Sequence, residues 1–489
     1  MNTPIRRLAV ACLVLFLALM GNATYVQFID ADNLNAEPNN KRVIDDEYSR
    51  ERGAILVDGE PVAQSVRSDD QFEFLRTYPE GALFAHLTGY FSYTYGRSAV
   101  ENSENPILSG SDNRLFVNRV VDLVANKQPK GGSVELTIDR SAQTTAAAAL
   151  AALPSGTKGS VVALDPQTGE ILAMVSQPSY DPNALASHDF GAVTQAWTAL
   201  NDDPAKPLLN RSTQEILPPG STFKLVTASA ALEQLNLTPA SVVQGGSELS
   251  FPGIEYTLPN AGGGNCGGDQ ISLEQALNVS CNVSFGSLAT QVGQGALEEQ
   301  AAKFGFGDKL IEGIASNASR FTTEGTELEA PQLAQSGIGQ FEVAATPLQM
   351  AMVAAGIAND GVVMKPHLVQ TVRDPSLRIL DDAGDGEEYG RALSPEHAAM
   401  MQQMMISTVE GGTASSARIP GQTVGGKTGT AQRGGDLPNL AWFASFAGSG
   451  ENQVAVAVVV ESATATDDIS GGRLAGPIAK AVMEALLSS

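Results

Sequence analysis

The feature that most constrains this chain is an uncharged run near its N-terminus, Leu8–Phe28, which follows Arg6 and Arg7. As an α-helix rising 1.5 Å per residue, the run is about 30 Å long, the hydrocarbon thickness of a bilayer. Nothing polar marks an outward face, as a buried core helix would require, so we expect residues 8–28 to span a membrane. The basic residues before it predict that residues 1–7 are cytoplasmic and that the remaining chain lies outside the cytoplasm.

A cleaved signal peptide is the alternative for the same segment. Its strictly apolar part, Leu8–Met20, also suits a signal-peptide core, and Gly21 and Ala23 offer small residues for cleavage. Cleavage would release a chain beginning near Thr24, whereas an anchor would hold the protein at the cell membrane by a single pass. We expect the anchor. Because no later segment approaches the length of a second span, the whole of the remaining chain should lie on one side of the membrane.

The composition excludes several classes of protein. The chain has 489 residues, with 30 Lys and Arg against 54 Asp and Glu, and its net charge of −24 would repel nucleic acid. Three cysteines are too few for a disulfide scaffold or a Cys-rich zinc fold. The histidines, which fall at no ligand spacing, are His86, His188, His367 and His397. We expect no nucleic-acid partner, no metal and no cofactor.

The patterning predicts two units after the anchor. Residues 29–156 are polar and contain short alternating stretches, typical of a small β-rich module. Residues 157–489 open with two apolar strands, Ser160–Asp165 and Glu170–Ser176, and return to strands at Ala441–Ala447 and Val454–Ser462. Strands at both ends with helices between them indicate one sheet flanked by helices, an α+β fold.

Helical patterns fill the middle of the second unit and close it. They cover Ser221–Leu235, Leu273–Val292, Pro347–Asn359, Pro395–Glu410 and Ala475–Leu487. The acidic stretch Asp381–Glu388 is most simply a solvated surface loop.

The first candidate catalytic residues are Ser221 and Lys224 in PPGSTFKLV. Two prolines and a glycine precede a helix that is predicted to begin at Ser221. One turn apart on one face, the hydroxyl and the amine can touch. Serine needs a base to act as a nucleophile, and a lysine among apolar neighbours titrates nearer neutrality. Because such a pair arises easily by chance, a capping serine with a surface lysine remains the alternative.

Two further motifs strengthen the first. Ser280 and Asn282 stand at Ser-x-Asn spacing in NVSCNVSF. Later in the chain, GGKTGTAQ is predicted to be a strand that begins with two glycines. The residues of the second motif are Lys427, Thr428, Gly429 and Thr430. Ser-x-x-Lys, Ser-x-Asn and Lys-Thr-Gly in this order are typical of serine acyltransferases that bind penicillin.

On these motifs, and on the accompanying patterns SGIGQFEVAATPLQMA (Ser336–Ala351) and VEGGTA (Val409–Ala414), the second unit resembles the transpeptidase domain of class B penicillin-binding proteins. The N-terminal unit also resembles them in RGAIL (Arg52–Leu56) and YPEGALFAHLTGY (Tyr78–Tyr90), although only Val57–Gly59 follow RGAIL where the family commonly has Asp-Arg-Asn-Gly. The likeness is strongest to the actinobacterial penicillin-binding protein A group. It implies a central antiparallel sheet flanked by helices, on an N-terminal pedestal or dimerisation-like module.

The resemblance also implies an activity, a membrane-anchored serine D,D-transpeptidase that crosslinks peptidoglycan in growth or division. Ser221 would attack the penultimate D-Ala carbonyl of a stem peptide with Lys224 as the base, and β-lactams would acylate the same serine. Ser280 would relay a proton to the amine, and Asn282 would bind the peptide's amide. The substrate carboxylate would be held by Lys427, Thr428 and Thr430 beside Gly429, with an oxyanion hole from the N–H groups of Ser221 and Thr430.

Two other functions remain open. A D,D-carboxypeptidase or β-lactamase-like hydrolase of the same fold would use water in place of an acceptor amine. A non-catalytic penicillin sensor or scaffold is the third class, but a sensor needs more cytoplasmic chain than residues 1–7 offer. The resemblance further implies a membrane glycan-strand polymerase and other division or elongation proteins as partners.

The remaining conspicuous residues have simpler interpretations. Trp197 and Trp442 are expected to serve packing. Cys266 and Cys281 both lie outside the cytoplasm on the anchor interpretation, where disulfides persist, so they are either bonded to each other or left unpaired as in many family members. Glu342 could support the site or cap a helix, and the sequence assigns it to neither.

Overall fold

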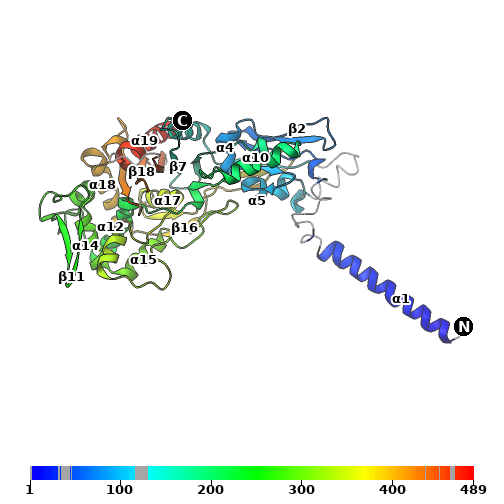
Figure 1. Cartoon of the computed structure of the whole chain (residues 1–489), viewed down its shortest axis with the longest axis horizontal. Helices are drawn as coiled ribbons and strands as arrows, with labels where there is room; N and C mark the ends of the chain where they lie inside the picture. The colour runs from blue at the N-terminus through cyan, green and yellow to red at the C-terminus, as the bar shows by residue number, and fades with distance from the viewer. Residues whose placement is uncertain are drawn as a thin grey trace.

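A computed structural model describes residues 3–30, 34, 45, 47–115, 130–434, 437–450, 452–462 and 469–488. Helix α1 (Thr3–Thr24), continued by the π-helical turn η1 (Tyr25–Ile29), extends away from the body of the protein (Figure 1). The helix begins before the uncharged run, so Arg6 and Arg7 lie within its first two turns. Its mean hydropathy of 2.0 over an 18-residue window, with none of that window buried, fits a single membrane span. The signal-peptide alternative stays open.

The core of the body is a five-stranded antiparallel sheet in the order β17-β18-β19-β7-β8. Its strands are β7 (Lys158–Leu164), β8 (Ile171–Gln177), β17 (Val424–Ala431), β18 (Leu440–Ser449) and β19 (Asn452–Glu461). The first and last parts of the second unit meet where β19 pairs with β7. The α+β fold with one flanked sheet is therefore confirmed.

Both faces of this sheet are buried, which is why its strands other than β17 are almost uniformly apolar. On β19, Val456 and Val458 face helices α8 (Arg140–Ala151) and α19 (Gly476–Leu487). The alternate residues, Ala455 and Ala457 among them, face the cluster that contains α12 (Lys224–Leu235) and α17 (Pro347–Ala358). Every residue of α17 is buried, so this helix crosses the middle of the core rather than covering it from outside.

The remaining helices of the second unit surround this core. They are α9 (Asn183–Ala186), α10 (Phe190–Asp202), α11 (Arg211–Gln214), α13 (Leu273–Asn278), α14 (Asn282–Val292), α15 (Gln294–Lys303), α16 (Ala330–Gly337) and α18 (Pro395–Gly411), with short turns η3 (Gly220–Phe223), η4 (Ser415–Ala417) and η5 (Gly471–Ala475). The helix predicted over Leu273–Val292 is wrong as a single element. Ser280 has φ +58° and Cys281 is extended, so the chain breaks into α13 and α14 at that point.

Small hairpins complete the second unit. Strands β10 (Glu248–Phe251) and β11 (Ile254–Pro259) pair, as do β9 (Val242–Gln244) with β12 (Gln270–Ser272) and β13 (Val362–Met364) with β16 (Glu388–Arg391). The acidic stretch 381–388 is largely exposed, as predicted, but it is the connection between two strands and its ends belong to them.

The N-terminal module contains a six-stranded sheet in the order β15-β14-β6-β1-β2-β3. Four strands come from the first unit: β1 (Ile55–Val57), β2 (Glu60–Arg67), β3 (Phe74–Thr77) and β6 (Ser133–Leu136). The other two, β14 (Val369–Arg373) and β15 (Ile379–Asp382), come from far along the second unit. The two units expected from the sequence are therefore joined by a shared sheet.

Short helices and a further hairpin fill out this module. They are α4 (Gly81–Thr88), β4 (Phe91–Ser92), β5 (Gly96–Arg97), α5 (Ala99–Ser103), α6 (Asn105–Leu108) and η2 (Asn113–Leu115). Helix α10 of the second unit lies across the module (Figure 1), and the ring of Phe190 at its start is 5.9 Å from that of Phe72.

A buried cluster of charges lies at the centre of the module. The Nε atoms of Arg52 and Arg76 each lie 2.6 Å from an oxygen of Glu101, and Tyr78 donates to the same carboxylate at 3.1 Å. Burial alone would raise the pKa of Glu101, but the two guanidinium charges outweigh it and lower that pKa. Arg52 of the RGAIL pattern and Tyr78 of the YPEGALF pattern therefore meet at one buried carboxylate.

Candidate active site

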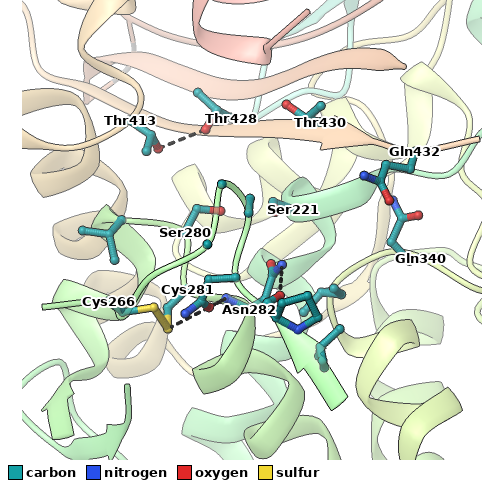
Figure 2. A pocket seen from close by; sticks show the side chains of 18 of the residues that line it. Ser221, Cys266, Ser280, Cys281, Asn282, Gln340, Thr413, Thr428, Thr430 and Gln432 are labelled. Atoms are coloured by element: carbon teal, nitrogen blue, oxygen red, sulfur yellow. Dashed lines mark hydrogen bonds between the residues drawn. A yellow bond between two sulfur atoms is a disulfide. The ribbon is translucent and has the colours of Figure 1, made fainter. Parts of the chain in front are cut away.

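The three motifs meet at a cleft of about 980 Å³ (Figure 2). Strand β17 forms one wall, and the loop after β11 and the turn between α13 and α14 form the opposite wall. The predicted site residues that line the cleft are Ser221, Ser280, Asn282, Thr428 and Thr430. Lys224 and Lys427 are fully buried, each with 0% of its surface exposed.

Ser221 lies in η3, one turn before α12, so the predicted helix start is displaced by three residues. The preceding Gly220 has φ +53°, and its N–H donates to the carbonyl of Gly339 at 2.9 Å. A Cβ on Gly220 would lie 2.7 Å from the carbonyl oxygen of Thr430, so β17 approaches the turn closely. This close approach places Ser221 beside the Lys-Thr-Gly strand.

Lys224 points toward the second motif. Its Nζ lies 2.7 Å from the carbonyl oxygen of Ser280, 2.7 Å from Oδ1 of Asn282 and 3.3 Å from Oγ of Ser280. In the described part of the chain, the Ser221 hydroxyl makes no hydrogen bond, so the direct contact expected between Ser221 and Lys224 is not formed. Catalytic hydrogen bonds of free enzymes often tighten only when substrate binds.

Lys427 reaches the same serine from β17. Its Nζ donates to Oγ of Ser280 at 2.8 Å and to the carbonyl oxygen of Thr428 at 2.8 Å. Burial lowers the pKa of Lys427 to about 7. Burial, reinforced by the charge of Lys427, holds the pKa of Lys224 well below its ordinary value. The site therefore favours a neutral Lys224.

A neutral Lys224 matches its three contacts. A carbonyl oxygen and an amide oxygen can only accept, so two amine protons are used on Ser280 O and Asn282 Oδ1. The remaining contact faces Oγ of Ser280, whose hydroxyl proton can be donated to the amine lone pair. Lys427, Ser280 and Lys224 thus form a continuous path for a proton.

The second motif is held rigidly. Asn282 opens α14, and its Nδ2 donates to the carbonyl of Pro259 at 3.0 Å. Oδ1 of Asn260 accepts the backbone N–H groups of Asn282 and Val283 at 3.0 and 3.1 Å, which satisfies donors that the start of a helix leaves unpaired. Asn260 was not identified from the sequence, because its capping role depends on a segment distant in the chain.

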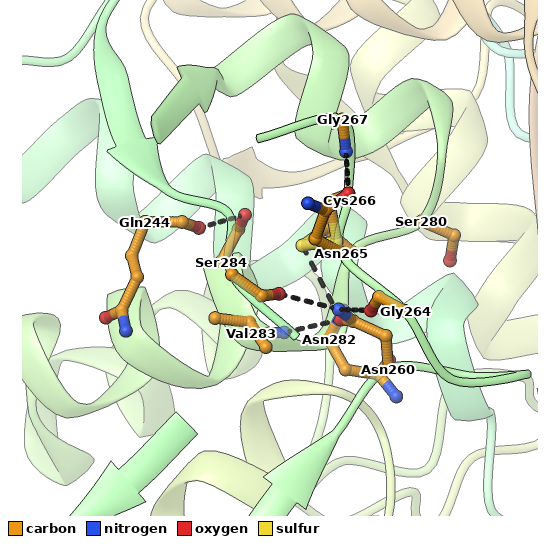
Figure 3. The surroundings of a disulfide bond; sticks show 12 residues. Gln244, Asn260, Gly264, Asn265, Cys266, Gly267, Ser280, Asn282, Val283 and Ser284 are labelled. Carbon is orange, nitrogen blue, oxygen red and sulfur yellow. Dashed lines mark hydrogen bonds between the residues drawn. A yellow bond between two sulfur atoms is a disulfide. The ribbon is translucent and has the colours of Figure 1, made fainter. Parts of the chain in front are cut away.

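A disulfide joins Cys266 to Cys281 (Figure 3), so the structure contains the bonded alternative of the two that the sequence left open. Cys281 lies between the two motif residues, and Cys266 belongs to a glycine-rich loop that also lines the cleft. Nδ2 of Asn260 donates to the carbonyl of Gly264 in the same loop and to that of Gly246 in the connection between β9 and β10. The bond therefore ties this wall of the cleft to the turn that carries Ser280.

Several cleft residues were not predicted. The most distinctive are Thr413, Gln335, Gln340 and Gln432. The VEGGTA and SGIGQ patterns contain Thr413 and Gln340, so the signal was present without a role attached to it. Glu342 lies outside the cleft lining and accepts the N–H of Thr323 at 2.8 Å, so it stabilises a neighbouring loop.

Both tryptophans serve packing, as predicted. Trp442 is fully buried in the main core, and Trp197 stacks on Tyr95 with ring centroids 4.2 Å apart.

Comparison with known proteins agrees with this geometry. Residues 159–484 match the penicillin binding protein transpeptidase domain, and residues 52–134 match the penicillin binding protein A dimerisation domain. The chain is 43% identical to the peptidoglycan D,D-transpeptidase PbpA of Mycolicibacterium smegmatis and 41% identical to that of Mycobacterium tuberculosis, each over 100% of this chain and 99% of the relative.

A solved structure of penicillin-binding protein A from M. tuberculosis, a ceftriaxone acyl-enzyme complex, superposes with a TM-score of 0.86 at 40% identity. The superposition covers 91% of this chain and 100% of that one. Because the transpeptidase domain matches more than half of this chain and the PbpA relative is 43% identical over all of it, the chain belongs to the class B penicillin-binding proteins, the family of peptidoglycan D,D-transpeptidases.

Proposed function

We propose that this protein is a membrane-anchored D,D-transpeptidase that crosslinks peptidoglycan stem peptides through an acyl-enzyme on Ser221. The observation that carries the proposal is the convergence of the three motifs on one cleft, with two buried lysines meeting at Ser280. A capping serine with a surface lysine, the simpler interpretation of the first motif, is incompatible with a lysine that is fully buried.

In the acylation step, Oγ of Ser221 bonds to the penultimate D-Ala carbonyl carbon, and its proton passes to neutral Lys224. The amide bond to the terminal D-Ala breaks, and the leaving amine takes a proton through Oγ of Ser280. In the second step an acceptor amine attacks the ester, its proton returns along the same path, and Ser221 is regenerated with a new peptide crosslink.

The other motif residues hold the substrate. Lys427, Thr428 and Thr430 bind the terminal carboxylate, and Gly429 keeps β17 close to η3. The backbone N–H groups of Ser221 and Thr430 form the oxyanion hole, which the close approach of Gly220 to Thr430 favours. Asn282 orients Lys224 and offers its amide to the peptide.

The location follows from the N-terminus. Helix α1 anchors the protein in the cell membrane and the cleft lies on the extracytoplasmic side, where a disulfide persists. A membrane glycan-strand polymerase and other division or elongation proteins are the partners that this role requires. The domains of the proposal are the tail 1–7, the anchor 8–28, the pedestal module 29–156 and the transpeptidase domain 157–489.

The first test is covalent labelling of the full-length protein in detergent by a fluorescent penicillin. The adduct should map to Ser221, and intact-mass measurement of Ser221→Ala should show none. An adduct that persists on Ser221→Ala would refute the nucleophile.

The second test separates transfer from hydrolysis. The full-length protein is incubated with a donor stem peptide and a labelled amine acceptor, and the two products are quantified by mass spectrometry. Transfer to the amine should exceed hydrolysis. If only the shortened peptide forms, the protein is a D,D-carboxypeptidase, the second candidate.

A further inference from the structure

We infer that the end of the cleft next to Thr413 is the acceptor subsite, and that Val279 is its specificity-determining residue, whose exposed side chain packs against the alkyl chain that carries the attacking amine. The inference rests on the proposed function and deepens it, because it gives the second substrate of the same reaction a surface of its own. The ligand class is a primary amine on an unbranched alkyl chain.

The cleft has two ends, which different segments of the chain build. Figure 2 shows Thr413 and Gln340 at opposite ends, with Ser221 and Ser280 between them. Thr413 lies against the start of the Lys-Thr-Gly motif on β17, because its hydroxyl accepts a hydrogen bond from Thr428 at 2.9 Å. The two ends are called here the Thr413 end and the Gln340 end.

Val279 lies at the Thr413 end. The residue before it, Asn278, accepts the N–H of Thr413 through its carbonyl oxygen at 3.1 Å, so the two segments adjoin at this point. Asn278 is itself held at the end of α18, since its Nδ2 donates to Ser407 at 2.9 Å and its Oδ1 accepts from Thr408 at 3.2 Å. Val279 is therefore fixed in place, lines the cleft and is 39% exposed.

The Gln340 end has its own exposed apolar side chain, Tyr256. Of the described residues that line the cleft, Val279 and Tyr256 are the two large apolar ones that are exposed. Tyr256 lies beside Gln335, whose carbonyl accepts the N–H of Gln340 at 3.0 Å. Each end of the cleft thus offers one exposed apolar surface to a substrate chain.

Two glycines of η5 complete the lining of the Thr413 end. A Cβ on Gly472 would lie 2.9 Å from the carbonyl oxygen of Thr413, and one on Gly471 would lie 2.7 Å from that of Gly429. The η5 backbone therefore packs directly against β17 and Thr413, and it adds two residues without side chains to the wall of the cleft. Val279 remains the large apolar side chain at this end.

The chemistry assigns the Thr413 end to the acceptor. In the proposed acylation, Lys427 and Thr428 hold the terminal D-Ala, so this leaving group departs on the side of Thr413. Formation of the crosslink is the reverse of that bond cleavage with a new amine, so the acceptor nitrogen attacks from the position that the D-Ala nitrogen has left. The chain behind the acceptor nitrogen then lies at the Thr413 end, against Val279.

The step balances with groups already in the site. The lone pair of the acceptor nitrogen forms a bond to the ester carbonyl carbon, and the bond between that carbon and Oγ of Ser221 breaks. The nitrogen loses one proton through Oγ of Ser280 to Lys224, and Oγ of Ser221 takes that proton up. A charged ammonium has no lone pair for this attack.

The surface of the cleft suits the neutral amine. The described residues that line it include no Asp or Glu, so an ammonium would find no counter-ion there. The exposed side chain of Val279 instead offers apolar contact to the methylene groups next to the amine. The Thr413 end therefore selects acceptors by the length of their alkyl chain.

The test measures how the acyl-enzyme divides between transfer and hydrolysis. Full-length protein in detergent receives a donor peptide that ends in D-Ala-D-Ala and one of two amines: Nα-acetyl-lysinamide, whose amine ends a butyl chain, or glycinamide, which has no such chain. Val279→Thr keeps the β-branched shape and replaces one methyl group by a hydroxyl. With Nα-acetyl-lysinamide, the ratio of transfer to hydrolysis should fall roughly 3- to 10-fold, the loss expected for one buried methyl group.

Three controls accompany this measurement. With glycinamide, Val279→Thr should give the wild-type ratio, and Val279→Ile should keep the wild-type ratio with both amines. Tyr256→Thr removes the exposed apolar side chain of the Gln340 end, so it should leave the ratio unchanged whatever it does to the total product. Because both products come from the same acyl-enzyme, the ratio is independent of the acylation rate and of the amount of folded protein.

The outcomes distinguish the inference from the proposed function. If wild type hydrolyses the donor and transfers it to neither amine, the proposed function fails and the inference fails with it. If wild type transfers but Val279→Thr keeps its ratio with Nα-acetyl-lysinamide, only the inference is overturned. An equal fall with both amines, or a fall of the same size in Tyr256→Thr, would also overturn it.

Discussion

Two regions of this protein bury charged side chains, and they do so in opposite ways. In the N-terminal module, Glu101 is fully buried between Arg52 and Arg76, and both arginines contact it at 2.6 Å. In the cleft, Lys224 and Lys427 are equally buried, but neither has a carboxylate partner among the described residues. Their Nζ atoms hydrogen-bond to hydroxyl, amide and carbonyl oxygens, and that of Lys224 also lies over the Phe285 ring, 5.6 Å from its centroid.

The difference separates structural charge from reactive charge. Opposite charges at close range favour the ionised form and keep Glu101 a carboxylate, so that cluster holds β-strands and short helices together. An amine buried without a counter-ion is pushed toward its neutral form, which is the form that can accept a proton. The same amount of burial therefore produces a rigid module in one place and a base in the other.

Removing the base should give the largest effect. Lys224→Ala leaves the cleft walls in place but removes the proton acceptor, so acylation by penicillin should fall by roughly 10²- to 10⁴-fold. Stopped-flow or quenched labelling measures the rate, and retained non-covalent binding of penicillin serves as the control for an intact cleft. Near-normal acylation would show that Lys224 is not the base and that Ser280 must be reconsidered.

Removing the counter-ion in the N-terminal module should destabilise the protein without altering the chemistry. Glu101→Gln leaves two buried guanidinium groups without their carboxylate, so the free energy of unfolding should fall by about 3–5 kcal/mol. Denaturant unfolding measures the loss. At temperatures where the variant remains folded, its acylation rate should match wild type, and a selective loss of acylation would mean that the module controls the cleft.

The disulfide offers a smaller test of how the reactive region is held. Reducing Cys266–Cys281 opens a loop of about 16 residues, and chain entropy predicts a loss on the order of 3 kcal/mol. The melting temperature should fall on reduction, and hydrogen exchange should increase most around Ser280. Cysteines that react with alkylating agents before any reductant is added, in protein from an oxidising compartment, would contradict the bond.

The two regions should also gain stability with rising pH in two separate windows, because folding lowers the pKa of Glu101 and that of Lys427. The pKa of Glu101 is lowered on folding, so its stabilisation is present above the ordinary glutamate pKa and is lost as pH falls through the folded value. The pKa of Lys427 falls from 10.5 to about 7, so the unfolded chain binds more protons between those values. Stability from this group should therefore increase as pH rises across that window, by about 1.4 kcal/mol per pH unit at most.

Unfolding of wild type and Lys427→Met at several pH values measures this contribution as the difference between their slopes. Lys427→Met should reduce the rise between pH 7 and 10.5 and leave the share that comes from Lys224, and Glu101→Gln should leave the rise unchanged. Identical slopes for wild type and Lys427→Met would mean that Lys427 stays charged in the folded protein.

Much of the fold was predictable because local sequence patterns mark its helices and strands. The strands of the central sheet were predicted to within two residues at each end, since both of their faces are buried and their apolar runs end at clear turns. The helices at Pro347 and Pro395 were likewise found at their starts, where proline occupies the first turn. The long helix predicted after Leu273 failed, because the left-handed residue that divides it, Ser280, is not of a type that marks a break.

The sequence by itself determined the order of the reactive motifs, the apolar N-terminal helix and the apolar strands near the two ends of the second unit, because each depends on neighbouring residues or on periodicity. Only the tertiary structure decided what each buried group faces. It turned Lys224 toward Ser280, enclosed Glu101 between two arginines, carried β14 and β15 into the N-terminal sheet and set Thr413 against Thr428. Periodicity reports that a face is buried, but the partner on that face is chosen by packing between segments far apart in the chain, and that choice sets each group's charge state and reactivity.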